Sequence, residues 1–157
     1  MRFTVLLTLG LSASVACGPG NGLEGSLSQA YELEHTRTRA RRYSTELAIE
    51  YVDRRGAVPV RISVYVPEGE TLGKGTYDLV ERGDLTGRTA EGQPIPRLRS
   101  GSVELEDYAD RDGARVRARA DAKFDVGDDT LTLHAEVDTE LERVDWPLRP
   151  AVTEVSP

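Results

Sequence analysis

"ARVRARADAKFDVGDDTLTLHAEVDTEL", residues 114–141, is the stretch that decides the fold. Apolar and polar residues alternate in it with a period of two, which is typical of strands buried on one face. The Asp- and Gly-containing segment 125–129 interrupts the alternation and predicts a turn, so the stretch is a β-hairpin. The side chains expected to point inward are Ala114, Val116, Ala118, Ala120, Ala122, Phe124, Leu131, Leu133, Ala135, Val137 and Leu141.

Charges on the other face of this hairpin agree with one register. If Phe124 lies opposite Leu131, Arg119 faces Glu136, and the remaining pairs are Arg117 with Asp138 and Arg115 with Glu140. Pairing Leu105 with Val116 adds a second acidic strand, with Glu106 beside Arg115 and Glu104 beside Arg117. Such cross-strand pairs stabilise a register. We therefore interpret the three arginines as a charge-matched outer face rather than as a polyanion-binding stripe.

Other segments show the same period of two. Residues 57–66, "AVPVRISVYV", place Val58, Val60, Ile62, Val64 and Val66 on one face, and Pro59 indicates a strand start or an edge. Further strands are expected around 27–33, 47–51, 76–80 and 103–105, and the main loop at 82–99. The prediction is all-β: a single antiparallel β-sandwich or small β-barrel of about seven to eight strands, with the β-domain at 27–146 and an irregular C-terminal tail at 147–157.

Composition limits the possible functions. The 157 residues include 27 Asp and Glu against 20 Lys and Arg, with one cysteine and two histidines. The acidic balance disfavours nucleic acid as a partner. One cysteine allows no internal disulfide and no cysteine-based zinc cluster. We expect no cofactor and no metal.

The first sixteen residues, "MRFTVLLTLGLSASVA", have the anatomy of a secretory signal peptide. Arg2 precedes an apolar run from Phe3 to Leu11, and small residues follow. The run is too short to span a bilayer, which needs about 20 apolar residues. We therefore expect residues 1–16 to direct export and to be removed.

Residues Ser14-Val15-Ala16-Cys17 resemble the lipobox of bacterial lipoproteins, although a leucine usually stands where Ser14 does. The resemblance implies cleavage before Cys17 and acylation of its thiol. An ordinary signal peptidase would cut the same bond and leave a free thiol, which is a liability in an oxidising compartment. Lipidation of Cys17 is the favoured interpretation, and the Gly-rich residues after it predict a flexible tether, so that 17–26 form the lipidated cysteine and its tether.

Short motifs carry weaker signals. "RTRARR", residues 37–42, is expected at a turn between strands, either solvated or in contact with anionic lipid headgroups. Arg82-Gly83-Asp84 is interpreted as ordinary turn chemistry rather than an adhesion motif. Calcium needs about six to eight oxygen ligands. The acidic turn at 110–113 lacks the further acids of a calcium loop, so the turns at 110–113 and 125–129 are interpreted as hairpin turns rather than as calcium sites. His134 is expected beside Asp121 as an exposed polar pair, and His35 near a strand end, so no catalytic residue is assigned.

Three functions remain. The first is an exported, non-enzymatic protein of the cell envelope, anchored to the membrane through Cys17, with a β-domain that binds or scaffolds an unknown envelope protein or ligand. In the lipobox family, an Asp directly after the cysteine marks retention in the inner membrane in some enteric bacteria. Gly18 occupies that position here, so this signal would not retain the protein in the inner membrane. The alternative is a small β-barrel that carries an apolar ligand behind the inward alanines of residues 114–122. The least favoured is an enzyme of unfamiliar type that uses His134 and Asp121.

Overall fold

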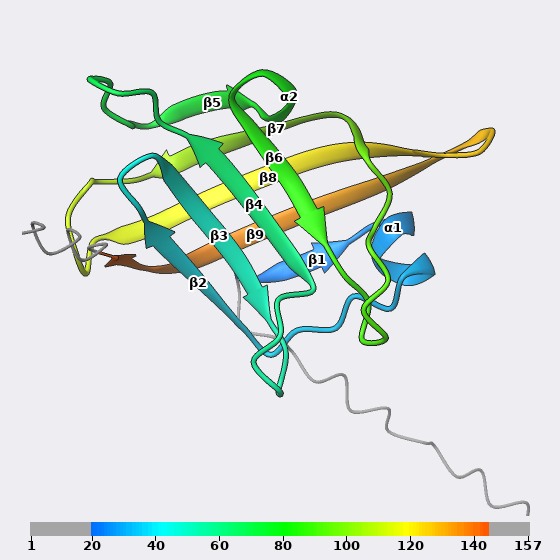
Figure 1. Ribbon diagram of the computed structural model, residues 1–157. Coiled ribbons are helices and arrows are strands. Elements are labelled where there is room, and N and C mark those ends of the chain that lie inside the picture. The colour runs from blue at the N-terminus through cyan, green and yellow to red at the C-terminus, as the bar shows by residue number, and fades with distance from the viewer. Residues whose placement is uncertain (1–19, 145–157) are drawn as a thin grey trace, which may run out of the picture.

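The computed structural model describes residues 20–144, which form a β-structure of two crossing layers (Figure 1). The strands are β1 (Gly22–Glu24), β2 (Arg37–Arg42), β3 (Glu46–Val52), β4 (Val60–Tyr65), β5 (Gly75–Asp78), β6 (Gly83–Gly87), β7 (Leu98–Asp107), β8 (Arg115–Val126) and β9 (Asp129–Arg143). Two short helices interrupt them, α1 (Ser26–Ala30) and α2 (Leu79–Arg82). The prediction of an all-β sandwich or barrel is confirmed.

The strands form one nearly closed sheet in the order β5-β7-β8-β9-β2-β3-β4-β6, and β1 pairs separately with β9. One layer holds β2, β3, β4 and β6, and the other holds β5, β7, β8 and β9 (Figure 1). The long strand β9 joins them, because its last residues pair with β2 from Ala40↔Leu141 to Arg42↔Arg143. This pairing is parallel, so the expectation of a wholly antiparallel sheet is wrong there. The chain reverses through α1 between β1, which is antiparallel to β9, and β2.

The register of the β8–β9 hairpin is the predicted one. Phe124 lies opposite Leu131, and Arg119 lies opposite Glu136. The neighbouring β7–β8 register is shifted by two residues from the prediction, because Leu105 lies opposite Ala118 instead of Val116. A shift of two keeps every side chain on its expected face, so hydrophobic alternation cannot detect it. Irregularities in β7 between Leu98 and Ser100 and between Leu105 and Asp107 set the observed register.

The core lies between the two layers. Its largest fully buried side chains include Tyr51 and Phe124, which come from opposite layers. The Tyr51 hydroxyl donates a hydrogen bond to the backbone oxygen of Glu136 at 2.7 Å, so the polar tip of this buried ring is satisfied. The inward alanines Ala118, Ala120 and Ala122 belong to the same continuous core. Their small side chains let the facing layer approach closely.

Residues 20–33 differ from the predictions. Gly22–Glu24 form strand β1 against β9, so a flexible tether is wrong for residues 22–26, and residues 17–19 lie outside the described part. The expected strand at 27–33 is instead the helix Ser26–Ala30 and an irregular segment. Gly25 permits the junction, because its φ is +110° and a Cβ there would lie 2.4 Å from the oxygen of Thr132. Leu27 and Tyr31 are four residues apart, a spacing that also suits one helical face.

Three boundaries farther along the chain also differ. The "RTRARR" cluster forms strand β2 instead of a turn. The expected strand at 76–80 ends at Asp78, whose side chain accepts hydrogen bonds from the N–H groups of Val80 and Glu81 and so caps α2. The long loop at 82–99 contains strand β6, which has one buried inward residue, Leu85, and is too short for alternation to reveal. The predicted tail at 147–157 lies outside the described residues.

Candidate functional site

The outer face of the β7–β8–β9 layer is covered by ion pairs. Arg119 contacts Glu106 at 3.1 Å and Glu136 at 3.6 Å, and Arg117 contacts Glu106 at 3.5 Å. Arg115 reaches the diagonal neighbour Asp138 at 2.5 Å, instead of the directly opposite residue. Each of the three arginines of β8 therefore has a carboxylate partner, in agreement with the interpretation of a charge-matched face.

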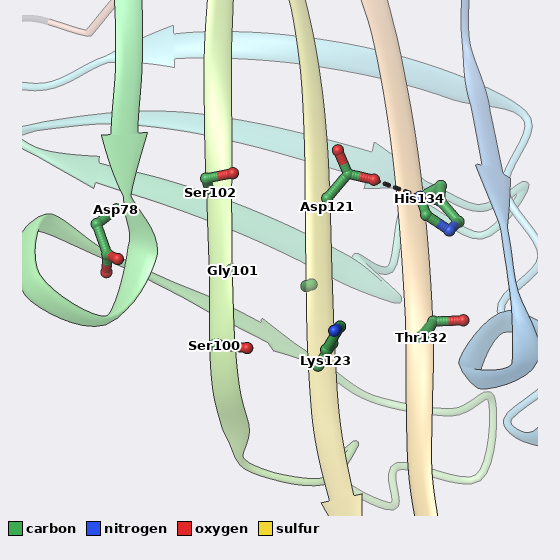
Figure 2. A pocket seen from close by; sticks show the side chains of 9 residues that line it. Asp78, Ser100, Gly101, Ser102, Asp121, Lys123, Thr132 and His134 are labelled. Atoms are coloured by element: carbon green, nitrogen blue, oxygen red, sulfur yellow. Dashed lines mark hydrogen bonds and ion pairs between the residues drawn. The ribbon is translucent and has the colours of Figure 1, made fainter.

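A shallow depression of about 310 Å³ lies on the same layer, where Gly101 contributes no side chain (Figure 2). Three polar residues cross it in one row, because Ser102 lies opposite Asp121 and Asp121 lies opposite His134. The imidazole Nδ1 contacts the Asp121 carboxylate, as Figure 2 shows. The sequence-predicted pair is thus brought together by the hairpin register.

This row does not have the order that nucleophilic catalysis requires. A serine nucleophile needs the imidazole as its direct neighbour, with the carboxylate behind the imidazole. Here Asp121 stands between Ser102 and His134. The side chains of His134 and Asp121 are also 59% and 69% exposed, so water screens the pair. The row can hydrogen-bond a polar ligand, and it supports no nucleophilic step.

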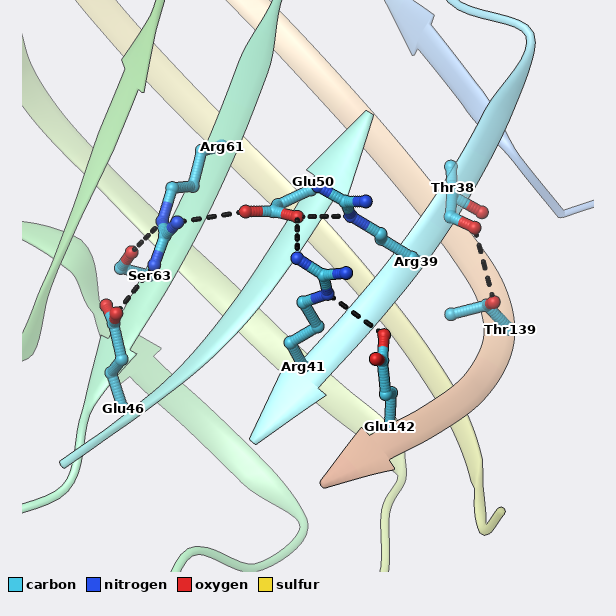
Figure 3. A network of polar contacts seen from close by, with 9 residues as sticks. All are labelled: Thr38, Arg39, Arg41, Glu46, Glu50, Arg61, Ser63, Thr139 and Glu142. Carbon is cyan, nitrogen blue, oxygen red and sulfur yellow. Dashed lines mark hydrogen bonds and ion pairs between the residues drawn. The ribbon is translucent and has the colours of Figure 1, made fainter. Parts of the chain in front are cut away.

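The outer face of the other layer is organised around Glu50, whose side chain is only 4% exposed (Figure 3). Its carboxylate contacts three guanidinium groups: Arg61 at 2.9 Å, Arg41 at 3.9 Å and Arg39. The sheet register produces this arrangement, because Arg39 and Arg61 are the cross-strand neighbours of Glu50 on its two sides. We call these four residues the Glu50 cluster.

Two outer carboxylates balance the Glu50 cluster. Arg61 also contacts Glu46 at 2.6 Å, and Arg41 contacts Glu142 at 2.9 Å (Figure 3). Three arginines therefore face three glutamates. A buried carboxylate is tolerated only when it is paired and hydrogen-bonded in this way. We interpret the cluster as a structural lock between β2, β3 and β4.

The sequence interpretation missed Glu50. It grouped the residues of "ELAIEYV" by their apolar face, and Glu50 lies on the opposite face. One signal could have revealed it. The arginines of "RTRARR" alternate along the chain, as an outward row on a strand does, and such a row requires acidic partners on the next strand.

A groove of about 620 Å³ adjoins the Glu50 cluster, between β4 and β6 on one side and residues 94–98 on the other. Arg61, Arg88 and Arg97 line it together with Glu50 and Asp84. Glu50 is already held by the cluster, and within residues 20–144 Arg88 and Arg97 form no ion pair with a carboxylate. Arg88 donates to the backbone oxygen of Gly92 at 3.1 Å, and the Asp84 carboxylate in the lining likewise forms no ion pair within residues 20–144. The two guanidinium groups of Arg88 and Arg97 outnumber this one carboxylate, and guanidinium binds anionic groups in a bidentate manner.

The remaining motifs have structural roles. In the Arg82-Gly83-Asp84 tripeptide, Arg82 ends α2 and pairs with Glu70 at 2.7 Å, while Gly83 and Asp84 begin β6. At the turn 110–113, Asp110 contacts Arg42 at 3.3 Å, and Asp112 accepts the N–H of Arg143. Across residues 20–144, no group of three or more His, Cys, Asp or Glu side chains is placed to hold a metal ion.

His35 packs edge-on against the ring of Tyr51, with 4.9 Å between the ring centroids. Burial lowers the pKa of His35 from its ordinary value of 6.5, although a hydrogen bond to the backbone of Asn21 acts in the opposite direction. The unfolded chain therefore binds this proton more readily than the folded chain. His35 stabilises the fold fully above about pH 6.5, and this contribution is lost as the pH falls through the lower pKa of the folded state.

We expect the free energy of unfolding to fall as the pH is lowered from about 7 to 5, and the variant His35→Gln to fall less steeply over this interval. Urea-induced unfolding at several pH values, followed by circular dichroism, measures both slopes. Equal slopes in the two proteins would contradict the assignment to His35.

Comparisons with known proteins identify no relative: no family model, no curated protein and no solved structure matches the chain. In the described part, no helix is long and apolar enough to cross a membrane. Cys17, the predicted lipid attachment residue, lies outside the described residues.

Proposed function

We propose that the protein is an exported, lipid-anchored protein of the cell envelope whose β-domain is a non-catalytic binding module. The observation that supports the anchor is the sequence Ser14-Val15-Ala16-Cys17 at the end of a signal-like segment. Acylation of the cysteine removes a thiol that an oxidising compartment would attack. Two or more acyl chains give durable anchoring, whereas a single chain gives marginal binding.

Labelled palmitate tests the anchor in cells that express the full chain. We expect wild-type protein to incorporate the label and to fractionate with membranes, and we expect Cys17→Ser to do neither. Ser14→Ala is the matched control, because alanine is also small and leaves the acceptor thiol in place. Incorporation of label into the Cys17→Ser protein would overturn the assignment.

The groove beside the Glu50 cluster is the proposed ligand site. Its support is the pair of guanidinium groups of Arg88 and Arg97, which form no ion pair with a carboxylate of residues 20–144. The ligand we propose is therefore anionic, with carboxylate, phosphate or sulfate groups.

A photo-crosslinking residue at Thr86, an exposed position of the groove, tests this site in intact envelopes. We expect an adduct at position 86 that is lost in the Arg97→Glu background, because reversal of one charge repels an anion. Arg111→Glu is the matched control, since Arg111 is an exposed arginine in the turn between β7 and β8. An adduct of equal yield in both backgrounds would contradict the proposed site.

The carrier of an apolar ligand is the less favoured alternative. It requires free space behind the inward alanines of β8. These alanines pack into one continuous core with residues of the facing layer, among them Tyr51 and Ile62. The packing therefore supports a filled interior, and we place the ligand on the outer face.

A further inference from the structure

The first described residues are fastened to one particular end of the domain. The Asn21 side chain bridges two strands: its Nδ2 donates to the backbone oxygen of Asp138 in β9 at 3.2 Å. Its Oδ1 accepts from the Thr38 hydroxyl in β2 at 2.7 Å and from the Asp138 N–H at 2.9 Å. Because Thr38 is the second residue of β2, the chain enters the domain at the start of that strand.

The distance from this entry point to the proposed anchor is short. Gly20 is three positions after Cys17 in the chain, which limits the reach between them to about 11 Å. Strand β2 alone has six residues and spans about 20 Å. An anchor at Cys17 therefore holds the start of β2 near the bilayer, whereas the other end of the strand is about 20 Å farther from the anchor.

Three exposed arginines lie at this same end. Arg37 begins β2 opposite Val52, the last residue of β3, and the turn after β3 carries Arg54 and Arg55 (Figure 1). None of the three forms an ion pair with a carboxylate of the described chain. The carboxylate of Asp53 instead accepts the N–H groups of Arg55 and Ala57, both at 2.8 Å, and so holds the turn in shape.

The other end of β2 is different. Its last residue, Arg42, accepts the N–H of Val144 at 3.0 Å through its backbone oxygen, and its side chain contacts Asp110. The chain thus leaves the described part at the end opposite to the one where it enters. An exposed loop with Gly69 follows β4 and lies at this far end, because β4 runs from the turn at 53–57 toward it (Figure 1).

We propose that the end formed by the start of β2 and the turn between β3 and β4 lies against anionic lipid headgroups, with Arg37, Arg54 and Arg55 as the contacts. This orientation rests on the proposed lipid anchor at Cys17. The chain without residues 1–16 has a net charge of −8, because Arg2 is lost from the full-chain value of −7. This charge acts only weakly at a distance, because the Debye length at physiological ionic strength is about 8 Å. Charges elsewhere on the domain are screened, whereas the arginines within reach of the anchor meet the phosphates directly.

Two single-cysteine variants of the lipidated full chain test the orientation. Gly56→Cys and Gly69→Cys are matched, because both glycines have a positive φ (+86° and +82°) and neither Cβ would meet an atom within 4 Å. Acylation occupies the Cys17 sulfur, so a thiol-reactive fluorophore labels only the new residue. Each purified protein is inserted into phosphatidylcholine vesicles that contain no other protein. The vesicles are prepared with or without phosphatidylglycerol and carry a nitroxide quencher on the lipid headgroup.

We expect stronger quenching at position 56 than at position 69 in the vesicles with phosphatidylglycerol. Arg54→Glu and Arg55→Glu should each weaken the quenching at position 56, because each lowers the population of molecules in this orientation by about fivefold. Arg111→Glu, at a distant turn, should leave it unchanged. Circular dichroism of each variant establishes that a loss of quenching is not a loss of fold.

Each contrary result has a separate meaning. Palmitate incorporation with equal quenching at positions 56 and 69 overturns the orientation and leaves the anchor intact. If quenching at position 56 is stronger than at position 69 but is unchanged in both Arg54→Glu and Arg55→Glu, the headgroup contacts are overturned. A further contrary result is a thiol at position 56 that is shielded from the fluorophore in cells, without stronger quenching at this position in vesicles that contain no other protein. That result assigns this end to a protein partner and overturns the membrane contact. Absence of palmitate overturns the anchor and the orientation together.

Discussion

Replacement of Glu50 by glutamine is expected to lower the free energy of unfolding by about 3 kcal/mol. Glutamine keeps the shape of the side chain but removes the charge that three arginines share (Figure 3). Loss of one partner from a buried ion pair costs about 3–5 kcal/mol, because the other charge stays buried without compensation. The side chains of Arg39, Arg41 and Arg61 are 27–32% exposed and can partly return to water, which places this site at the lower end of that range.

Glu142→Gln is the control for this experiment, since Glu142 pairs with Arg41 at 2.9 Å but is 56% exposed. Exposed pairs contribute about 0–1 kcal/mol, so we expect a small loss that added salt reduces further. Urea-induced unfolding measures both variants. Equal losses would show that burial of Glu50 is not what makes its pairs strong.

Replacement of Phe124 by alanine is expected to cost about 4 kcal/mol. Phe124 is 0% exposed and lies on β8 opposite Leu131 of β9 and Leu98 of β7. The neighbouring inward residues of β8, Ala120 and Ala122, are too small to fill the space that the ring would leave. Loss of apolar contact and an unfilled cavity therefore act together.

Phe124→Leu is the matched variant, because leucine keeps most of the apolar volume, and a loss of about 1 kcal/mol is expected. Thermal and urea-induced unfolding give the two values. A loss in Phe124→Ala no larger than in Phe124→Leu would indicate that the layers collapse into the space, contrary to a tightly packed core.

Much of the fold could be predicted from local pattern. The alternation in β8 and β9, with the acidic turn between them, specifies both the hairpin and its register, because apolar faces and opposite charges agree on one alignment. The pair His134–Asp121 followed directly from that register. The β7–β8 register did not, because a shift of two residues leaves the pattern unchanged and is decided by the irregularities in β7.

The predictions were weakest where segments are short or where partners are distant in sequence. Strand β6 and the two helices are too short to show a period. The segment "RTRARR" forms strand β2 because it pairs with β3 and with the end of β9, which lies about a hundred residues later in the chain. The groove lined by Arg88 and Arg97 depends on residues 94–98 crossing beside β6, which no local signal encodes.

The sequence by itself determined that this chain is a β-protein with a charge-matched hairpin, because a period of two and the pairing of opposite charges are local properties. It also placed the single cysteine behind a signal-like segment, which is the basis of the proposed anchor. The tertiary structure alone decided how close the folded domain begins to that cysteine. Asn21 bonds to β2 and to β9, and β9 is distant from it in sequence. Glu50 is buried beneath three arginines because β2, β3 and β4 pair side by side in this register. The Asn21 bridge arises only when β9 lies beside β2 and so joins the two layers.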